Sequence, residues 1–139
     1  MNENLQNDYS QNGALIVSVS TASGAIPIEG AIVTVYGSDE ENSSVRTVLY
    51  TNQSGNTEKI ILPAPPAALS EVPGNIAPFA KYNLDVNQEG FNARTFVNVP
   101  IFAGVTSIQP VNLVPLTEYG GEAILPNDST VTESQSPSL

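Results

Sequence analysis

The stretch Tyr82–Phe91, with the sequence YNLDVNQEGF, decides the fold class of this chain. Apolar and polar residues alternate along its first part, with Tyr82, Leu84 and Val86 on one side and Asn83, Asp85 and Asn87 on the other. Successive side chains of a β-strand point to opposite faces, so this alternation predicts a strand with one face on a core and the other in water. Gly90 then ends the strand, and Phe91 is expected to anchor its end in the core.

The same alternation, or an enrichment in β-branched residues, recurs in six further segments: Ala14–Ser20, Ala31–Tyr36, Val45–Thr51, Thr57–Leu62, Arg94–Val99 and Thr106–Leu116. The last segment changes its alternation between Ile108 and Val111, which predicts a bulge near Pro110. The turn Gln53–Asn56 predicts a hairpin loop, because Gly55 is free to take positive φ. No segment has a helical period, so helix content is expected to be near zero. The strands predict a seven-stranded antiparallel β-sandwich.

The chain has 139 residues, enough for one domain with tails. Residues 1–12 are polar and rich in Asn, and residues 118–139 are rich in Ser, Thr and acids, so both ends are expected to be disordered tails around a sandwich at residues 13–117. The segment Pro63–Lys81 carries five prolines and is long for a sandwich connection. We expect it to drape over one end of the sandwich through Leu69, Ile76 and Phe79, and a functional loop is the alternative.

The chain contains neither cysteine nor histidine. Disulfides, thiolate chemistry, Ser-His-Asp catalysis and His- or Cys-ligated metal sites therefore have no side chains to form them. We expect that the chain is not an enzyme and has no catalytic, cofactor-binding or metal-binding residues. Catalysis by carboxylates alone is the alternative, with Glu58 and Glu89 as candidates. The acids Asp39–Glu41 suit a calcium ion, but three consecutive acids favour a solvated turn.

Fourteen acidic residues and four basic ones give the chain a net charge of −10. This charge repels nucleic acid, so a nucleic-acid partner is not expected. The first residues have no apolar stretch flanked by basic residues, and no run of about 20 apolar residues occurs. We therefore expect no signal peptide and no membrane span, and, if Met1 is the natural start, no classical export.

Three stretches resemble the carboxypeptidase-regulatory-like and Cna-B-like domains, a family with a transthyretin-like (prealbumin-like) Greek-key sandwich. They are Gly13–Val35 with its turn GAIPIEGA, the turn Thr51–Thr57 followed by IILPA, and Tyr82–Phe91. The resemblance covers residues 13 to 116. It implies the fold, but this chain lacks the residues that two activities of the family require. The first predicted strand has no lysine for an isopeptide bond, and hydroxyisourate hydrolysis requires histidines.

A narrower resemblance covers the Pro-rich segment and Asn98–Leu113, which are similar to non-catalytic modules of clostridia-like bacteria. Such modules occur alone or beside peptidoglycan-binding and spore-cortex-lytic domains. The resemblance implies a non-catalytic structural or interaction module of the bacterial envelope or spore, with a protein or glycan partner. A carbohydrate- or peptidoglycan-binding module is the alternative. We expect a monomer or weak oligomer, and the candidate partner-binding residues are Leu69, Ile76, Phe79, Phe96 and Phe102.

Overall fold

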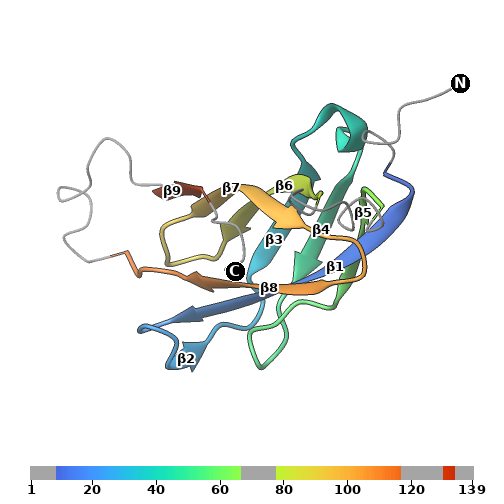
Figure 1. Cartoon of the computed structure of the whole chain (residues 1–139). Coiled ribbons are helices and arrows are strands. Elements are labelled where there is room, and N and C mark those ends of the chain that lie inside the picture. The colour runs from blue at the N-terminus through green and yellow to red at the C-terminus, as the bar shows by residue number, and fades with distance from the viewer. Residues whose placement is uncertain (1–8, 67–77, 117–129, 134–139) are drawn as a thin grey trace, which may run out of the picture.

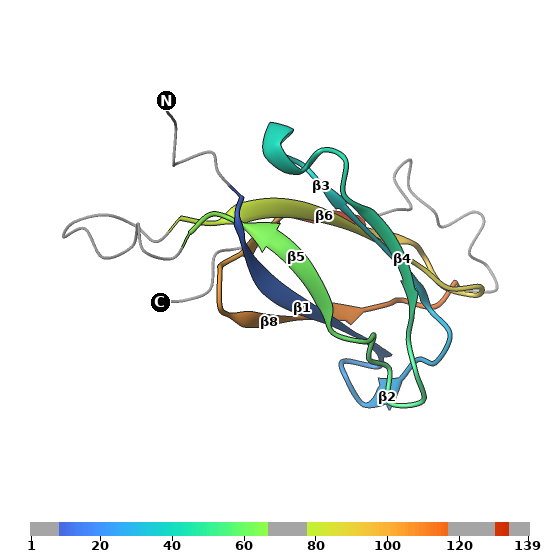
Figure 2. The same cartoon turned by 90° about the vertical axis from the view of Figure 1, so that its right-hand side faces the viewer.

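The computed structural model describes residues 9–66, 78–116 and 130–133. Two β-sheets pack face to face in this part of the chain (Figures 1 and 2). The one helical element among the described residues is a single 3₁₀ turn, η2, at Glu40–Asn42. The predicted all-β, two-sheet architecture is therefore confirmed. No described helix is long and apolar enough to cross a membrane.

The smaller sheet is built around β1, Gln11–Thr21. Two strands run antiparallel to it, β5 (Ile60–Ala64) beside its first half and the two-residue β2 (Ile26–Pro27) beside its end. On its other side β8 (Thr106–Asn112) runs parallel to it, from Ala14 opposite Thr106 to Ser20 opposite Asn112. The first and last strands of the predicted body therefore lie side by side (Figure 1).

The larger sheet has the strand order β4-β3-β6-β7-β9. Its members are β3 (Ile32–Gly37), β4 (Arg46–Tyr50), β6 (Ala80–Asn87), β7 (Arg94–Ile101) and β9 (Thr130–Glu133). The first three junctions are antiparallel, and β9 runs parallel to β7. Within the described residues β4 therefore forms one edge of this sheet and β9 forms the other.

Four details of the predicted topology are wrong. The sandwich is not fully antiparallel, because β8 and β9 pair in parallel, and β2 and β9 add to the seven predicted strands. The predicted hairpin around Gln53–Asn56 is a turn between sheets, since β4 and β5 belong to different sheets. The predicted bulge near Pro110 is absent, because β8 keeps an unbroken register with β1 from Thr106 to Asn112.

The core lies between the two sheets, where the alternating apolar residues of the sequence converge. The fully buried side chains include Leu15, Val17 and Val19 on β1, Val33 and Val35 on β3, and Tyr82, Leu84 and Val86 on β6. Each such side chain contributes about 1.5–3 kcal/mol through removal of apolar surface from water. The polar end of Tyr82 is accommodated by a hydrogen bond of 2.6 Å from its hydroxyl to the backbone oxygen of Pro63.

The turn at residues 51–57 holds the two sheets together through its side chains. The hydroxyl of Thr51 accepts a hydrogen bond from the backbone N–H of Ala31 (2.9 Å) and donates one to the backbone oxygen of Ile28 (2.7 Å). The hydroxyl of Thr57 accepts a hydrogen bond of 3.0 Å from the N–H of Val17. Asn52 caps the turn as expected, its Oδ1 accepting hydrogen bonds from the N–H groups of Ser54 and Asn56.

Both predicted tails contain residues that belong to the folded structure. In the segment 1–12, Tyr9 packs against the core and β1 begins at Gln11. In the segment 118–139, β9 adds a strand to the larger sheet. The remaining residues of these two segments lie outside the described part of the chain, as do residues 67–77 of the Pro-rich connection.

Candidate binding surface

On the outer face of β4, β3 and β6 the strand register brings together several exposed apolar and aromatic side chains. Tyr50 lies opposite Ile32, Val48 opposite Thr34, and Arg46 opposite Tyr36. Tyr50 is 61% exposed, Val48 50% and Ile32 39%. We name this surface, made of Ile32, Thr34, Tyr36, Arg46, Val48, Tyr50 and Asp85, the outer β4 face. Monomeric proteins leave few contiguous apolar patches in water, and such patches often mark interaction sites.

Asp85 supplies a carboxylate beside these apolar side chains. It lies opposite Thr34 on β3 and opposite Thr95 on β7. Its Oδ1 accepts a hydrogen bond of 2.9 Å from the hydroxyl of Thr95 and a longer one of 3.4 Å from that of Tyr36. Partial burial and the charge of Asp85 raise the pKa of Tyr36 above its usual value.

Arg46 supplies the positive charge of the outer β4 face. Its guanidinium carbon lies 5.5 Å from the ring centroid of Tyr36, within the range of a cation–π interaction. The surface therefore combines an apolar and aromatic part, a cation and an anion, which suits a partner with mixed chemistry.

No strand among the described residues pairs with the outer edge of β4. The N–H of Gly37 donates to the oxygen of Val45, and the N–H of Thr51 donates to the oxygen of Ala31, each at 3.1 Å. Backbone groups in an antiparallel pair alternate between facing the partner strand and facing away. The odd-numbered residues of β4 therefore bond β3, and Arg46, Val48 and Tyr50 direct their N–H and C=O groups away from it. Figure 2 views the side of the molecule on which β4 lies.

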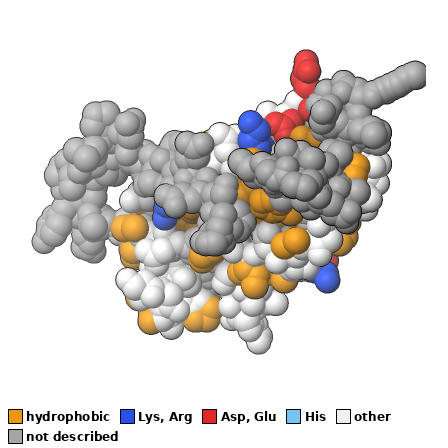
Figure 3. Space-filling model, in the orientation of Figure 1, with side chains coloured by type: hydrophobic (Ala, Val, Ile, Leu, Met, Phe, Trp, Pro, Cys, Tyr) orange, Lys and Arg blue, Asp and Glu red, His pale blue; other side chains and the backbone are white. Residues whose placement is uncertain are grey.

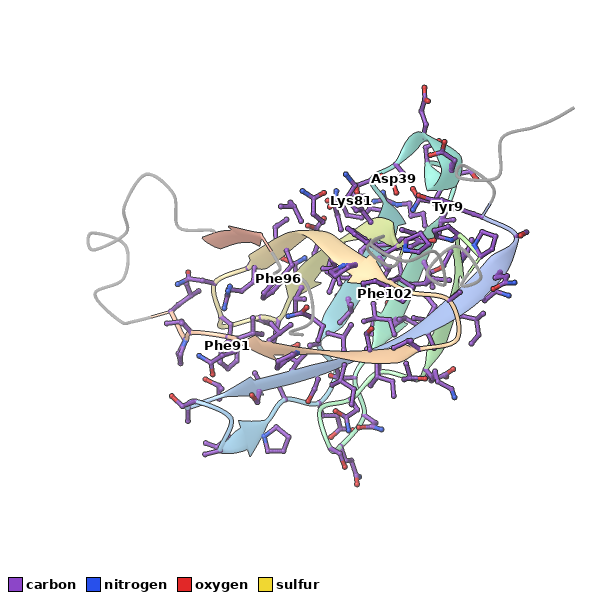
Figure 4. The ribbon with its side chains drawn as sticks, viewed as in Figure 1. Tyr9, Asp39, Lys81, Phe91, Phe96 and Phe102 are labelled. Atoms are coloured by element: carbon purple, nitrogen blue, oxygen red, sulfur yellow. The ribbon has the colours of Figure 1, made fainter. Side chains whose placement is uncertain are left out.

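Of the five candidate partner-binding residues, the structure brings two together. The rings of Phe79 and Phe102 lie with centroids 5.3 Å apart and planes tilted by 41°, an arrangement typical of paired aromatic rings. Both side chains are half-buried. Phe102 follows β7, and Figure 4 shows its side chain. Leu69 and Ile76 lie outside the described residues.

The prediction for Phe96 is wrong, because its side chain is buried in the core and only 5% exposed. Strand β7 pairs with β6 through a register shift between Tyr82 and Leu84, and Asn98 has a φ of 60°. The extra residue at this irregularity reverses the alternation of β7, so Phe96 and Val99 both point inward. The guanidinium of Arg94 lies 4.7 Å from the ring centroid of Phe96.

The acids Asp39–Glu41, for which the sequence favours a turn over a calcium loop, begin the η2 turn. Oδ2 of Asp39 accepts hydrogen bonds from the hydroxyl of Tyr9 (2.6 Å) and the backbone N–H of Lys81 (3.0 Å), and Oδ1 lies 4.0 Å from Nζ of Lys81. Figure 4 shows these three residues around η2, and Figure 3 shows basic beside acidic side chains at the top of the view. No group of three or more acidic side chains among the described residues has the geometry to hold a metal ion.

Sequence reasoning missed the outer β4 face, because none of its candidate partner-binding residues lies on β3 or β4. The signal was present in the segment Val45–Thr51, where Arg46, Val48 and Tyr50 share one side of the strand. A charged residue on that side indicates that it faces solvent, and the two apolar residues beside it are then exposed.

Comparison with solved structures gives the fold. A 3-chlorocatechol 1,2-dioxygenase from Rhodococcus opacus matches with a TM-score of 0.52 and 13% identity over 76% of this chain and 60% of that one. A catechol 1,2-dioxygenase from an Acinetobacter species matches with a TM-score of 0.52 and 11% identity over 88% and 58%. A DUF3823 family protein from Parabacteroides merdae has a TM-score of 0.50 and 12% identity over 76% and 47%.

The chain spans less than two thirds of the length of each of these three proteins. At these identities the likeness shows a shared β-sandwich fold and nothing about shared activity. No protein-family model matches the chain, and no curated protein matches it either.

These matches correct one expectation from the sequence. The prediction that the chain is not an enzyme is contradicted by the structural neighbours, because two of the three described above are dioxygenases. Enzymes are therefore among the proteins that contain this fold. The likeness is weak and assigns no catalytic role to any residue of this chain.

Proposed function

We propose that this chain is an interaction module of the bacterial envelope or spore that binds a partner through the outer β4 face. We further propose that it is a carboxypeptidase-regulatory-like domain with a transthyretin-like Greek-key arrangement. The sequence resemblance supports the family and the cellular setting. The exposed row of Ile32, Val48 and Tyr50 beside Arg46 and Asp85 is the observation that supports binding at this face.

The physical argument rests on what each part of the face contributes to binding. Burial of exposed apolar area drives association at about 25 cal/mol per Å² before the costs of ordering are subtracted. Arg and Tyr are enriched among the residues that contribute most to protein interfaces. Asp85 and Arg46 add charge-assisted hydrogen bonds that select a partner of matching polarity.

A pull-down from envelope and spore-coat extracts tests the proposal, with bound material identified by mass spectrometry and by sugar analysis. We compare the wild-type chain with Ile32→Glu, which places a charge directly opposite Tyr50 at the apolar end of the face. The matched control is Ile108→Glu on β8 of the smaller sheet, where Ile108 is 64% exposed. We expect a specific partner to be retained by the wild type and the control and lost by Ile32→Glu. Equal retention by all three proteins contradicts the assignment of the face.

A carbohydrate-binding module is a second candidate, supported by the Phe79–Phe102 pair at one end of the sandwich. Aromatic rings provide apolar faces on which sugar rings stack. A peptidoglycan pull-down on the wild type and Phe102→Ala tests it. We expect binding by the wild type that Phe102→Ala weakens, and absence of binding by both proteins rejects this candidate.

A further inference from the structure

The exposed side chains of β4 would match those of a second β4 strand that runs in the opposite direction. Arg46, Val48 and Tyr50 lie on the outer side of the sheet and carry the backbone groups that face away from β3. A strand that exposes a row of unpaired N–H and C=O groups is a template for pairing with another strand. The side chains of Arg46, Val48 and Tyr50 then restrict which strands can pair with this edge.

We infer that β4 pairs antiparallel with β4 of a second copy of this chain, with a two-fold axis through Val48. In this register Val48 lies opposite Val48 of the second copy, and Arg46 lies opposite Tyr50 of the second copy. All three residues have the backbone orientation that this pairing requires, so each opposed pair exchanges two hydrogen bonds. A two-fold interface of this kind uses the same patch on both subunits and therefore repeats every contact.

The side chains favour β4 of a second copy over a strand of arbitrary sequence. Arg46 already lies over the ring of Tyr36 on its own chain, and in the dimer it would also face Tyr50 of the second copy. Cross-strand pairs of this type contribute about 0.2–1 kcal/mol each relative to alanine pairs. Val48 and Tyr50, which are 50% and 61% exposed, would both lose water-accessible apolar surface.

The net charge of −10 on each copy opposes association. This repulsion acts over long distances and is screened within about 8 Å at physiological ionic strength. The contact itself contains Arg46, one of only four basic residues in the chain. Dimerisation should therefore become stronger as salt is added, which is opposite to the behaviour of a dimer held by complementary charges.

The inference goes beyond the proposed function and does not depend on it. Pairing at β4 joins two larger sheets into one continuous sheet, so the outer β4 faces of both copies become adjacent. A partner with repeated binding sites would then engage both copies, which raises its apparent affinity without new contacts.

Sedimentation equilibrium on the full chain, from about 10 µM to about 1 mM, measures the association directly. We expect the wild type to show a reversible monomer–dimer equilibrium. Val48→Pro should be monomeric, because proline lacks the central N–H and this N–H does not bond β3. Val48→Thr keeps the amide and the β-branched shape, and should still dimerise. Circular dichroism confirms that each variant is folded.

A charge exchange tests the register. Arg46→Glu and Tyr50→Lys should each weaken the dimer about 2- to 30-fold, because each disrupts two symmetric contacts. The double variant places the introduced glutamate of one copy opposite the introduced lysine of the other and should recover dimerisation. Residues 46 and 50 are four apart on an extended strand, about 13 Å, so they cannot pair within one copy.

Three results would overturn the inference: a wild type that stays monomeric throughout this range, a Val48→Pro variant that dimerises as well as the wild type, or a double variant no better than the single ones. Each of these results leaves partner binding at Ile32 untouched, because the pull-down compares variants that do not alter the edge of β4. Equal partner retention by the wild type, Ile32→Glu and Ile108→Glu, together with intact dimerisation, would in turn reject the proposed function alone.

Discussion

The hydroxyl of Tyr9 donates a 2.6 Å hydrogen bond to Oδ2 of Asp39, a residue thirty positions further along the chain. The same oxygen accepts the backbone N–H of Lys81 at 3.0 Å. Tyr9 also packs against the hydrophobic core. Tyr9 therefore joins the chain just before β1 to the start of η2, and the shared oxygen of Asp39 joins it to β6, so the folded domain begins earlier in the sequence than composition indicates.

Tyr9→Phe should destabilise the folded chain by about 1.5 kcal/mol, because it removes a hydrogen bond to a charged acceptor and leaves the ring in place. Chemical denaturation at neutral pH measures the loss. Tyr50→Phe is the matched control, since Tyr50 is 61% exposed. We expect this control to lie within about 0.5 kcal/mol of the wild type. Equal stability of both variants would show that the Tyr9 hydroxyl adds nothing to the fold.

Local sequence patterns predicted the strands that lie in the middle of the sheets. The side chains of Tyr82, Leu84 and Val86, which alternate with polar residues, have no exposed surface. Neighbouring strands on both sides fix the register of β6, so every second side chain points to the same face of the sheet. The same reasoning holds for Val33 and Val35 on β3. Patterns of this kind report burial directly, since they reflect which side of a strand meets the other sheet.

Features that depend on distant partners could not be predicted in the same way. The bulge that turns Phe96 inward requires Asn98 to take positive φ, a conformation that Asn tolerates but that no local pattern indicates. The parallel pairing of β8 with β1 joins strands at opposite ends of the domain. The place of β4 at the edge of its sheet, among the described residues, also depends on which strands pair with it, and the local sequence does not specify this.

Alkaline pH should destabilise the fold through Tyr82. Burial raises the pKa of Tyr82 to about 12 from its usual value of 10.0, with a further contribution from the charge of Asp39. Between these two values the unfolded chain releases the proton while the folded chain retains it, so stability falls as pH rises. The stabilisation is therefore complete below pH 10 and lost as the pH approaches 12. The pKa values of Tyr9 and Tyr36 shift in the same direction.

Urea denaturation at several pH values from about 8 to about 11 measures this dependence. Tyr82→Phe removes one of the three shifted groups and should show a shallower fall in stability with pH. At neutral pH the variant should be about 1 kcal/mol less stable, because it loses the hydrogen bond to the oxygen of Pro63. An identical pH dependence in wild type and variant would contradict the assignment to Tyr82.

Thr51→Val should destabilise the chain by about 2–3 kcal/mol. The threonine is 5% exposed, and its hydroxyl satisfies both the N–H of Ala31 and the oxygen of Ile28. Valine has almost the same shape and offers neither hydrogen bond, so two buried backbone groups lose a partner. Thr51→Ser keeps the hydroxyl and should recover most of the loss. If the serine variant is as unstable as the valine variant, the methyl group and not the hydroxyl is responsible.

Phe96→Ala and Phe102→Ala should differ in a way that separates core from surface. Phe96 is 5% exposed and packs within the core cluster, so its removal leaves a cavity and should cost about 3–5 kcal/mol. Phe102 is half-buried against Phe79, so its removal exposes one ring edge and should cost clearly less, about 1–2 kcal/mol. Thermal and urea unfolding of both variants measure these values. A larger loss at Phe102 than at Phe96 would contradict the inward orientation that the bulge at Asn98 gives to β7.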